Sequence, residues 1–234
     1  MEDQLANRDL LLLGAVVMMT VCMAIGMVTL YARRNIVLGA EWMVMFVSGC
    51  NLIVWFFTSN DWQWNLVWYL DAFSRIAGMN LLLYAGFATL THNFRPGLVA
   101  DALILGSIAL LAAAFMYVEF LEPAKNYAYS AAHFMFTPLL IFLTYEMYQI
   151  GKQHLMWLMV MTTITLTVST VMIDFRAPAE NDTNLFFNKD FVSLVSWGLG
   201  YLILSRVYVA MEEDRKSDTP KGTMFRLDHK IGRS

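Results

Sequence analysis

The segment LLLLGAVVMMTVCMAIGMVTLYA, residues 10–32, decides the fold class of this chain. It carries no charged side chain, and Arg33 and Arg34 follow it directly. A helix needs about 20 apolar residues to cross the roughly 30 Å hydrocarbon core of a bilayer, so this segment is long enough to span one. The arginine pair indicates a membrane stop, and the small-residue cleavage site of a signal peptide is missing. We therefore predict a transmembrane helix here.

The rest of the sequence repeats this pattern. Of 234 residues, 58% are hydrophobic and only 15% are charged, a composition at which a water-soluble domain would aggregate. Six further apolar blocks occupy residues 39–58, 66–91, 98–118, 127–149, 154–175 and 184–210. Short connections between them favour antiparallel neighbours. The sequence thus predicts an all-α membrane protein: a seven-helix up-down bundle over residues 1–210 and a disordered cytoplasmic tail over 211–234.

Lysine and arginine placement sets the expected orientation. Basic residues gather on the cytoplasmic side of membrane proteins, and the tail together with Arg33 and Arg34 places that side at the C-terminal end of the first helix. We expect the N-terminus outside and the C-terminus inside, most simply in a bacterial inner (plasma) membrane, with the lipid bilayer as the main partner. The net charge of −3 gives no indication of nucleic-acid binding.

Patterns of common enzyme and metal sites are missing from the sequence. It holds no nucleophilic triad, phosphate-binding glycine loop or zinc spacing, and its four histidines lack the mid-membrane pairing of a haem site. An enzyme is therefore the least supported class, and we expect no metal. Because ionisable groups at membrane depth are costly, each of them is instead a candidate functional residue.

Three charged residues stand out at membrane depth. Asp71 and Arg75 are spaced i, i+4 on one helix face and can pair, and Asp190 lies in the last apolar block. We predict a polar centre where these two helices face each other, with Arg75 between the two carboxylates or with one aspartate protonated. The alternative is an ion pair that only fixes helix register. If a buried charge were left unpaired, Arg75→Met would destabilise the protein by about 3–5 kcal/mol.

Three other carboxylates are expected to be solvated. Glu41, Asp101 and Glu146 fall near inner helix ends, where a side chain reaches water easily.

Two short motifs resemble the microbial rhodopsins, and the proteorhodopsins among them. The family's third helix reads Arg-Tyr-x-Asp-Trp, and the matching stretch here is Trp68-Tyr69-Leu70-Asp71-Ala72. Its seventh helix reads Asp-Phe-Val-Asn-Lys with a glycine four residues on, and here it is Asp190-Phe191-Val192-Ser193-Leu194 with Gly198. The resemblance implies a seven-helix fold in which Asp71 stands at the proton-acceptor position.

The departures from the family pattern bear on function. The resemblance places the retinal-binding lysine at Leu194, which cannot form a Schiff base, so no covalent cofactor is expected. Lys189, the nearest lysine, is about 7.5 Å away along a helix and faces another direction. Trp68 replaces the family's arginine, and Leu82 replaces its proton donor. Light-driven pumping in the family's form is therefore not expected.

A non-covalent ligand remains compatible with these departures. Retinal, a carotenoid or a lipid would fit a cavity left by the small Ala72 and the threonine-rich sixth helix. The candidate pocket residues are Trp68, Tyr69, Ala72, Thr163, Thr167 and Trp197. The first functional hypothesis is thus a rhodopsin-like protein that no longer pumps and acts as a sensor, scaffold or ligand binder.

Two alternatives belong to other classes. A small ion or solute transporter or channel would use Asp71, Arg75 and Asp190 along a polar path. An accessory subunit of a membrane complex would use its 17 methionines and small residues as packing surface. Either a homo-oligomer or a hetero-oligomer with a related membrane protein is compatible with the sequence.

Overall fold

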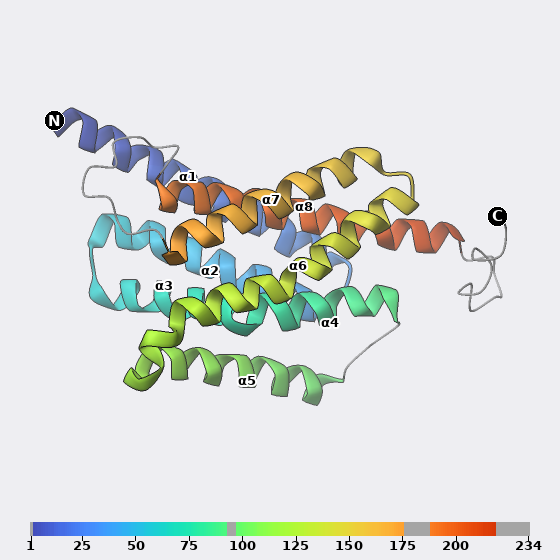
Figure 1. Cartoon of the computed structure of the whole chain (residues 1–234), viewed down its shortest axis with the longest axis horizontal. Helices are drawn as coiled ribbons and strands as arrows, with labels where there is room; N and C mark the ends of the chain where they lie inside the picture. The colour runs from blue at the N-terminus through green and yellow to red at the C-terminus, as the bar shows by residue number, and fades with distance from the viewer. Residues whose placement is uncertain (1, 93–96, 176–187, 219–234) are drawn as a thin grey trace.

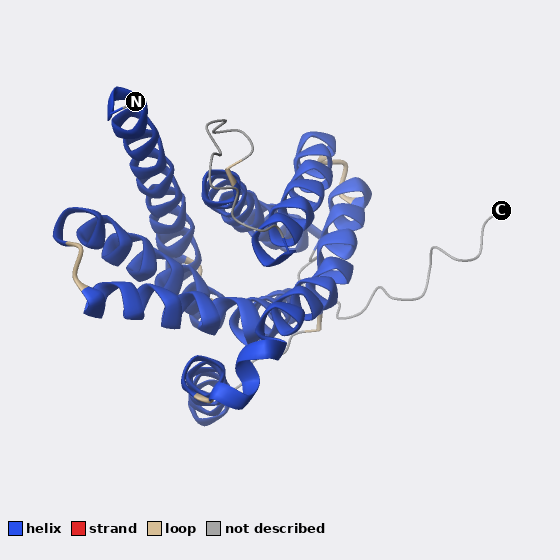
Figure 2. Ribbon diagram, turned by 60° about the vertical axis from the view of Figure 1, so that its left-hand side comes forward, coloured by secondary structure: helices blue, strands red, loops and turns tan. Residues whose placement is uncertain are grey.

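The computed structural model describes residues 2–92, 97–175 and 188–218. Every regular element in this part of the chain is helical (Figure 2). In chain order the elements are α1 (Glu2–Ala32), α2 (Ile36–Thr58), α3 (Asp61–Phe73), the π-helical segment η1 (Ser74–Gly78), α4 (Met79–Thr91), α5 (Leu98–Tyr117), the 3₁₀ segment η2 (Glu119–Ala124), α6 (Lys125–Gln149), α7 (Gln153–Phe175) and α8 (Lys189–Asp218). The axes of the long helices are roughly aligned with one another, and successive helices run back and forth along them (Figure 1).

Length and composition show what kind of protein this is. Six helices in the described residues are long and apolar enough to cross a membrane. The chain is therefore an all-α integral membrane protein. Segments α3, η1 and α4 follow one another without a loop over residues 61–91. They match the single helix predicted over 66–91, except that the π-helical turn was not foreseen.

The helices extend beyond several predicted limits. Helix α1 begins at Glu2 rather than at residue 10, and α8 continues to Asp218 rather than ending at 210. The predicted start of the last helix, residues 184–187, lies outside the described residues, as do residues 219–234 of the predicted tail.

Ion pairs account for the added length of α8. Arg33, directly after α1, donates hydrogen bonds to Glu212 and, at 3.1 Å, to Glu213. Lys216 also donates to Glu212 at 2.7 Å, in an i, i+4 pair. These contacts hold the end of α8 against the end of α1, so residues 211–218, which we expected to be disordered, are helical. We call this end of the bundle the Arg33 end and the opposite end the Asp190 end.

The helices pack as a ring. Helix α1 contacts α2 and α8, α8 contacts α7, and α7 contacts α6. Helix α6 contacts η1 and α4, which in turn contact α2. Helix α5 packs on α3 and η1 from outside this ring, and it lies at the lower edge of Figure 1.

Glycines allow α1 to approach both of its neighbours closely. A Cβ atom added at Gly26 would lie 2.2 Å from Trp42 Nε1 of α2, and one added at Gly198 of α8 would lie 2.9 Å from the Met19 Cα. Lipid gives membrane helices no hydrophobic driving force to associate, so close packing across small residues stabilises such crossings. The distance from α1 to each neighbour therefore depends on the absence of a side chain at Gly26 and at Gly198.

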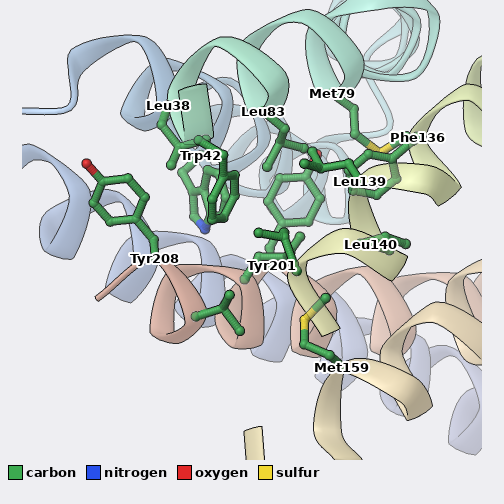
Figure 3. Close-up of a cluster of buried hydrophobic side chains, with 14 of the residues drawn as sticks. Leu38, Trp42, Met79, Leu83, Phe136, Leu139, Leu140, Met159, Tyr201 and Tyr208 are labelled. Carbon is green, nitrogen blue, oxygen red and sulfur yellow. The ribbon is translucent and has the colours of Figure 1, made fainter. Parts of the chain in front are cut away.

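The main core fills the ring toward the Arg33 end (Figure 3). Leu38 and Trp42 from α2, Leu83 and Phe87 from α4 and Tyr208 from α8 are all buried, with exposed fractions of 3% or less. The Phe87 and Tyr208 rings meet edge to face with centroids 5.7 Å apart.

Candidate functional site

A cavity of about 770 Å³ lies among α1, α2, α3, η1 and α8. Asp9 and Asp190, both exposed, line it at the Asp190 end, so the cavity reaches the surface there. Its inner wall is formed by Met19, Met45 and Met79, the last of which appears in Figure 3. Methionine side chains adapt to irregular apolar shapes. The lining is thus mostly apolar, with Asp9 and Asp190 at the open end and Asp71, Ser74 and Arg75 further in.

Tryptophans form one wall of the cavity. Trp55 and Trp64 stack with ring centroids 4.4 Å apart, and Trp68 meets Trp64 edge to face at 5.6 Å. All three line the cavity, and Trp197 lines it from α8. The cavity wall is therefore aromatic along α2, α3 and one side of α8.

The Asp71 and Arg75 side chains pair as their spacing predicts. Arg75 Nη1 lies 3.7 Å from Asp71 Oδ2, and both residues line the cavity. The Arg75 guanidinium also lies over the Tyr129 ring of α6, 4.2 Å from its centroid, a cation–π contact. The Asp71 side chain is 32% exposed, so water in the cavity can solvate it.

Asp190 lies apart from this pair. It lines the cavity from the first turn of α8, but it forms no ion pair within the described residues. Within the described residues Arg75 pairs with Asp71 and lies over the Tyr129 ring, and no ion pair joins it to Asp190, so the predicted bridge between the two carboxylates is not seen. The alternative, that one aspartate is protonated, stays a prediction.

Leu194, the position that the resemblance gives to the retinal lysine, lines the same cavity as Asp71, Trp68 and Trp197. Lys189 also lines it, one and a half turns of α8 nearer to the Asp190 end. The side chain of Leu194 is partly buried and packs against the main core cluster.

The other predicted pocket residues lie elsewhere. The Tyr69 hydroxyl donates to the Ala109 carbonyl of α5 at 3.1 Å, and Ala72 is fully buried in a second cluster with α5. Thr163 donates to the Met159 carbonyl, and Thr167 lies 3.2 Å from His133 Nε2. None of these four residues lines the cavity. Helix α3 turns Tyr69 and Ala72 toward α5, and α7 lines the cavity through Ile173 near its C-terminal end rather than through Thr163 or Thr167.

A buried carboxyl group, that of Glu41, lies next to the cavity. We expected Glu41 to reach water, but its exposed fraction is 0%. It lies six residues beyond Asn35, about 9 Å along α2 at 1.5 Å per residue, too deep for its short side chain to reach the helix end. Ser74 of η1 and Tyr201 of α8 both donate hydrogen bonds to Glu41 Oε1, the latter at 2.7 Å.

The π-helical turn shapes this contact. A Cβ atom at Gly78 would lie 2.7 Å from Glu41 Oε2 and 2.8 Å from the Phe73 carbonyl oxygen. The carboxyl group of Glu41 therefore occupies the space that a side chain at residue 78 would need. π-helical turns are rare and are often found at functional sites. Five apolar residues precede Glu41 in α2, which was the available sequence signal for its depth.

No protein-family model, curated protein or solved structure matches the chain. Within the described residues no cluster of histidine, cysteine and carboxylate side chains has the arrangement of a metal site. What the geometry offers is an apolar cavity with an aromatic wall, a charged rim and a buried acid beneath it.

Proposed function

We propose that this protein binds an elongated apolar molecule without a covalent bond, in the cavity between α1, α2, α3 and α8. Retinoids, carotenoids and lipids are the ligand classes that suit its lining. The observation that carries the proposal is a cavity of about 770 Å³ with methionines at its inner wall and tryptophans along its side. Ligand pockets have volumes of about 300–1,000 Å³ and are mostly apolar with a few polar groups.

The proposal includes a rhodopsin-like arrangement of seven spans. Two positions that the resemblance assigns, Asp71 for the proton acceptor and Leu194 for the retinal lysine, line the same cavity although they come from different helices. The uninterrupted helical residues 61–91 would supply the seventh span beside the six apolar helices. A non-pumping sensor follows from this arrangement, because Leu194 offers no amine.

Orientation and location belong to the same proposal. The Arg33 end would face the cytoplasm of a bacterial cell, since Arg33 and Arg34 lie there together with Arg215 and Lys216 in the last turn of α8. The cavity would then open to the outside, with Asp9 and Asp190 at its mouth.

A transporter is the second candidate, and the charged lining favours it. Asp71, Arg75 and Asp190 all line the cavity and would suit a path for an ion or polar solute. Binding is the stronger proposal because Leu38, Trp42, Phe87 and Tyr208 fill the ring between the cavity and the Arg33 end. Ion flux across liposomes containing the purified protein would favour the transporter.

Energy transfer from the tryptophans tests ligand binding. All-trans retinol and cis-parinaric acid, a fatty acid, would be titrated into the purified protein in lipid nanodiscs. We expect saturable transfer that Leu194→Trp weakens by at least about tenfold, or ~1.4 kcal/mol, because the indole fills the cavity. Leu199→Trp is the matched control, since Leu199 is on the same helix, is 44% exposed and does not line the cavity. Equal binding by the two variants for both probes would contradict the proposal.

A further inference from the structure

The Glu41 carboxyl group can bind and release a proton, a property that the proposed ligand binding does not use. It is fully buried among α2, η1 and α8, and its Oε2 atom has no hydrogen-bond partner within the described residues. No lysine or arginine of these residues forms an ion pair with it. A carboxylate without a cation is far more costly in such a place than the neutral acid.

The groups around Glu41 confirm that little else could balance a negative charge. Tyr201 from α8 is the titratable group in direct contact, and it acts as a neutral donor. The Asp71 and Arg75 pair lies on α3 and η1, on either side of Ser74, but these two charges balance each other. Helices α1 and α4 contribute apolar members of the main core, such as Met23 and Met79.

Ser74 connects this buried acid to the cavity. Its hydroxyl group contacts Glu41 Oε1 and lies 3.3 Å from the Tyr201 hydroxyl, and the same residue lines the cavity. We propose that Glu41 is a proton-binding site that exchanges its proton with the cavity through the Ser74 hydroxyl. This inference goes beyond ligand binding and does not depend on it.

The exchange reverses the hydrogen bond between Ser74 and Glu41. When the acid proton is on Glu41 Oε1, the Ser74 hydroxyl hydrogen rotates away from Glu41, so that Ser74 Oγ accepts the acid proton while donating its own proton to a water molecule in the cavity. One O–H bond breaks and one forms at Ser74, a carboxylate remains on Glu41, and a hydronium ion leaves. The reverse transfer restores the acid, and no electron moves.

The proton returns to the side from which it came. Leu38 lies beyond Glu41 toward the Arg33 end, and Trp42 follows Glu41 in α2; both have exposed fractions of 0%. Glu41 therefore stores a proton at the inner end of the cavity and does not pass it across the membrane. A charge at this position would disturb the contacts of α2 with η1 and α8, so the protonation state is coupled to helix packing.

Infrared spectroscopy tests the proposal without any ligand. The purified full chain in nanodiscs at neutral pH should show a carbonyl band of a protonated carboxylic acid. We expect Glu41→Gln to remove this band, because glutamine keeps the shape and the hydrogen-bond acceptor, and Asp71→Asn to leave it in place. Absence of any such band from the unmodified protein, or a band left unchanged in intensity and position by Glu41→Gln, would overturn the assignment.

Transfer into D₂O tests the route. The band should shift as deuterium replaces the proton, and Ser74→Ala should slow this shift by at least about tenfold. Ser48→Ala is the matched control, because Ser48 lines the same cavity and forms no hydrogen bond with Glu41. Equal exchange rates in the two serine variants would show that the proton reaches Glu41 by another path and would refute the role of Ser74.

Discussion

Alanine in place of Gly78 is expected to disturb the contact between η1 and Glu41. The added Cβ would lie 2.7 Å from Glu41 Oε2 and 2.8 Å from the Phe73 carbonyl oxygen, both closer than the 3.0 Å limit of real Cβ contacts. Neither neighbour can withdraw easily, since one is a fully buried carboxyl and the other is backbone of the π-helical turn. Either the turn or the carboxyl must move.

The magnitude follows from three contributions. Overpacking of a filled interior costs about 1–3 kcal/mol, and loss of one hydrogen bond to Glu41 costs about 0.5–1.5 kcal/mol more. The higher helix propensity of alanine returns about 1 kcal/mol. We expect Gly78→Ala to lower the free energy of unfolding by about 0.5–3.5 kcal/mol.

Unfolding in mixed micelles, with SDS as denaturant and circular dichroism as the signal, measures this change. Gly106→Ala is the matched control, because Gly106 is also helical and a Cβ there meets nothing within 4 Å. We expect the control to be as stable as the parent or up to ~1 kcal/mol more stable. If Gly78→Ala proved as stable as Gly106→Ala, the packing described for Glu41 would be refuted.

Two further substitutions test the packing and the ion pair. Gly26→Ala would place a Cβ 2.2 Å from the fully buried Trp42 ring, so we expect a loss of about 1–3 kcal/mol in the same unfolding assay. Gly14→Ala on the same helix meets nothing within 4 Å and should be as stable as the parent or up to ~1 kcal/mol more stable; equal losses in the two variants would contradict the close approach. Arg75→Met should cost about 1–2 kcal/mol rather than the 3–5 kcal/mol expected for a buried charge, because Asp71 is 32% exposed in the cavity. A loss above 3 kcal/mol would show that water does not reach Asp71.

The helices could be predicted because their signal is local. Each apolar block exceeds the length that a bilayer requires, so α2, α5, α6 and α7 begin and end within three residues of the predicted limits. The last turns of α8 could not be predicted, because their stabilisation depends on Arg33, which is 179 residues away from Glu212.

The same distinction applies to the site. The pairing of Asp71 with Arg75 is set by an i, i+4 spacing that the sequence displays. The contacts of Glu41 are not local, since Ser74 and Tyr201 are 33 and 160 residues away. The rotation of α3 that turns Tyr69 toward α5 depends in the same way on neighbours that one helix cannot reveal.

The most direct test of the proposed ligand site is a lysine at position 194. All-trans retinal would be added to the parent, to Leu194→Lys and to Leu199→Lys, followed by an absorption spectrum, borohydride reduction and peptide mapping. If the cavity accepts an elongated apolar ligand beside Leu194, only Leu194→Lys should become coloured, with a reduced adduct at residue 194. If Leu194→Lys formed no more adduct than Leu199→Lys, retinal would not reach the cavity at Leu194, and the proposed ligand site would be wrong.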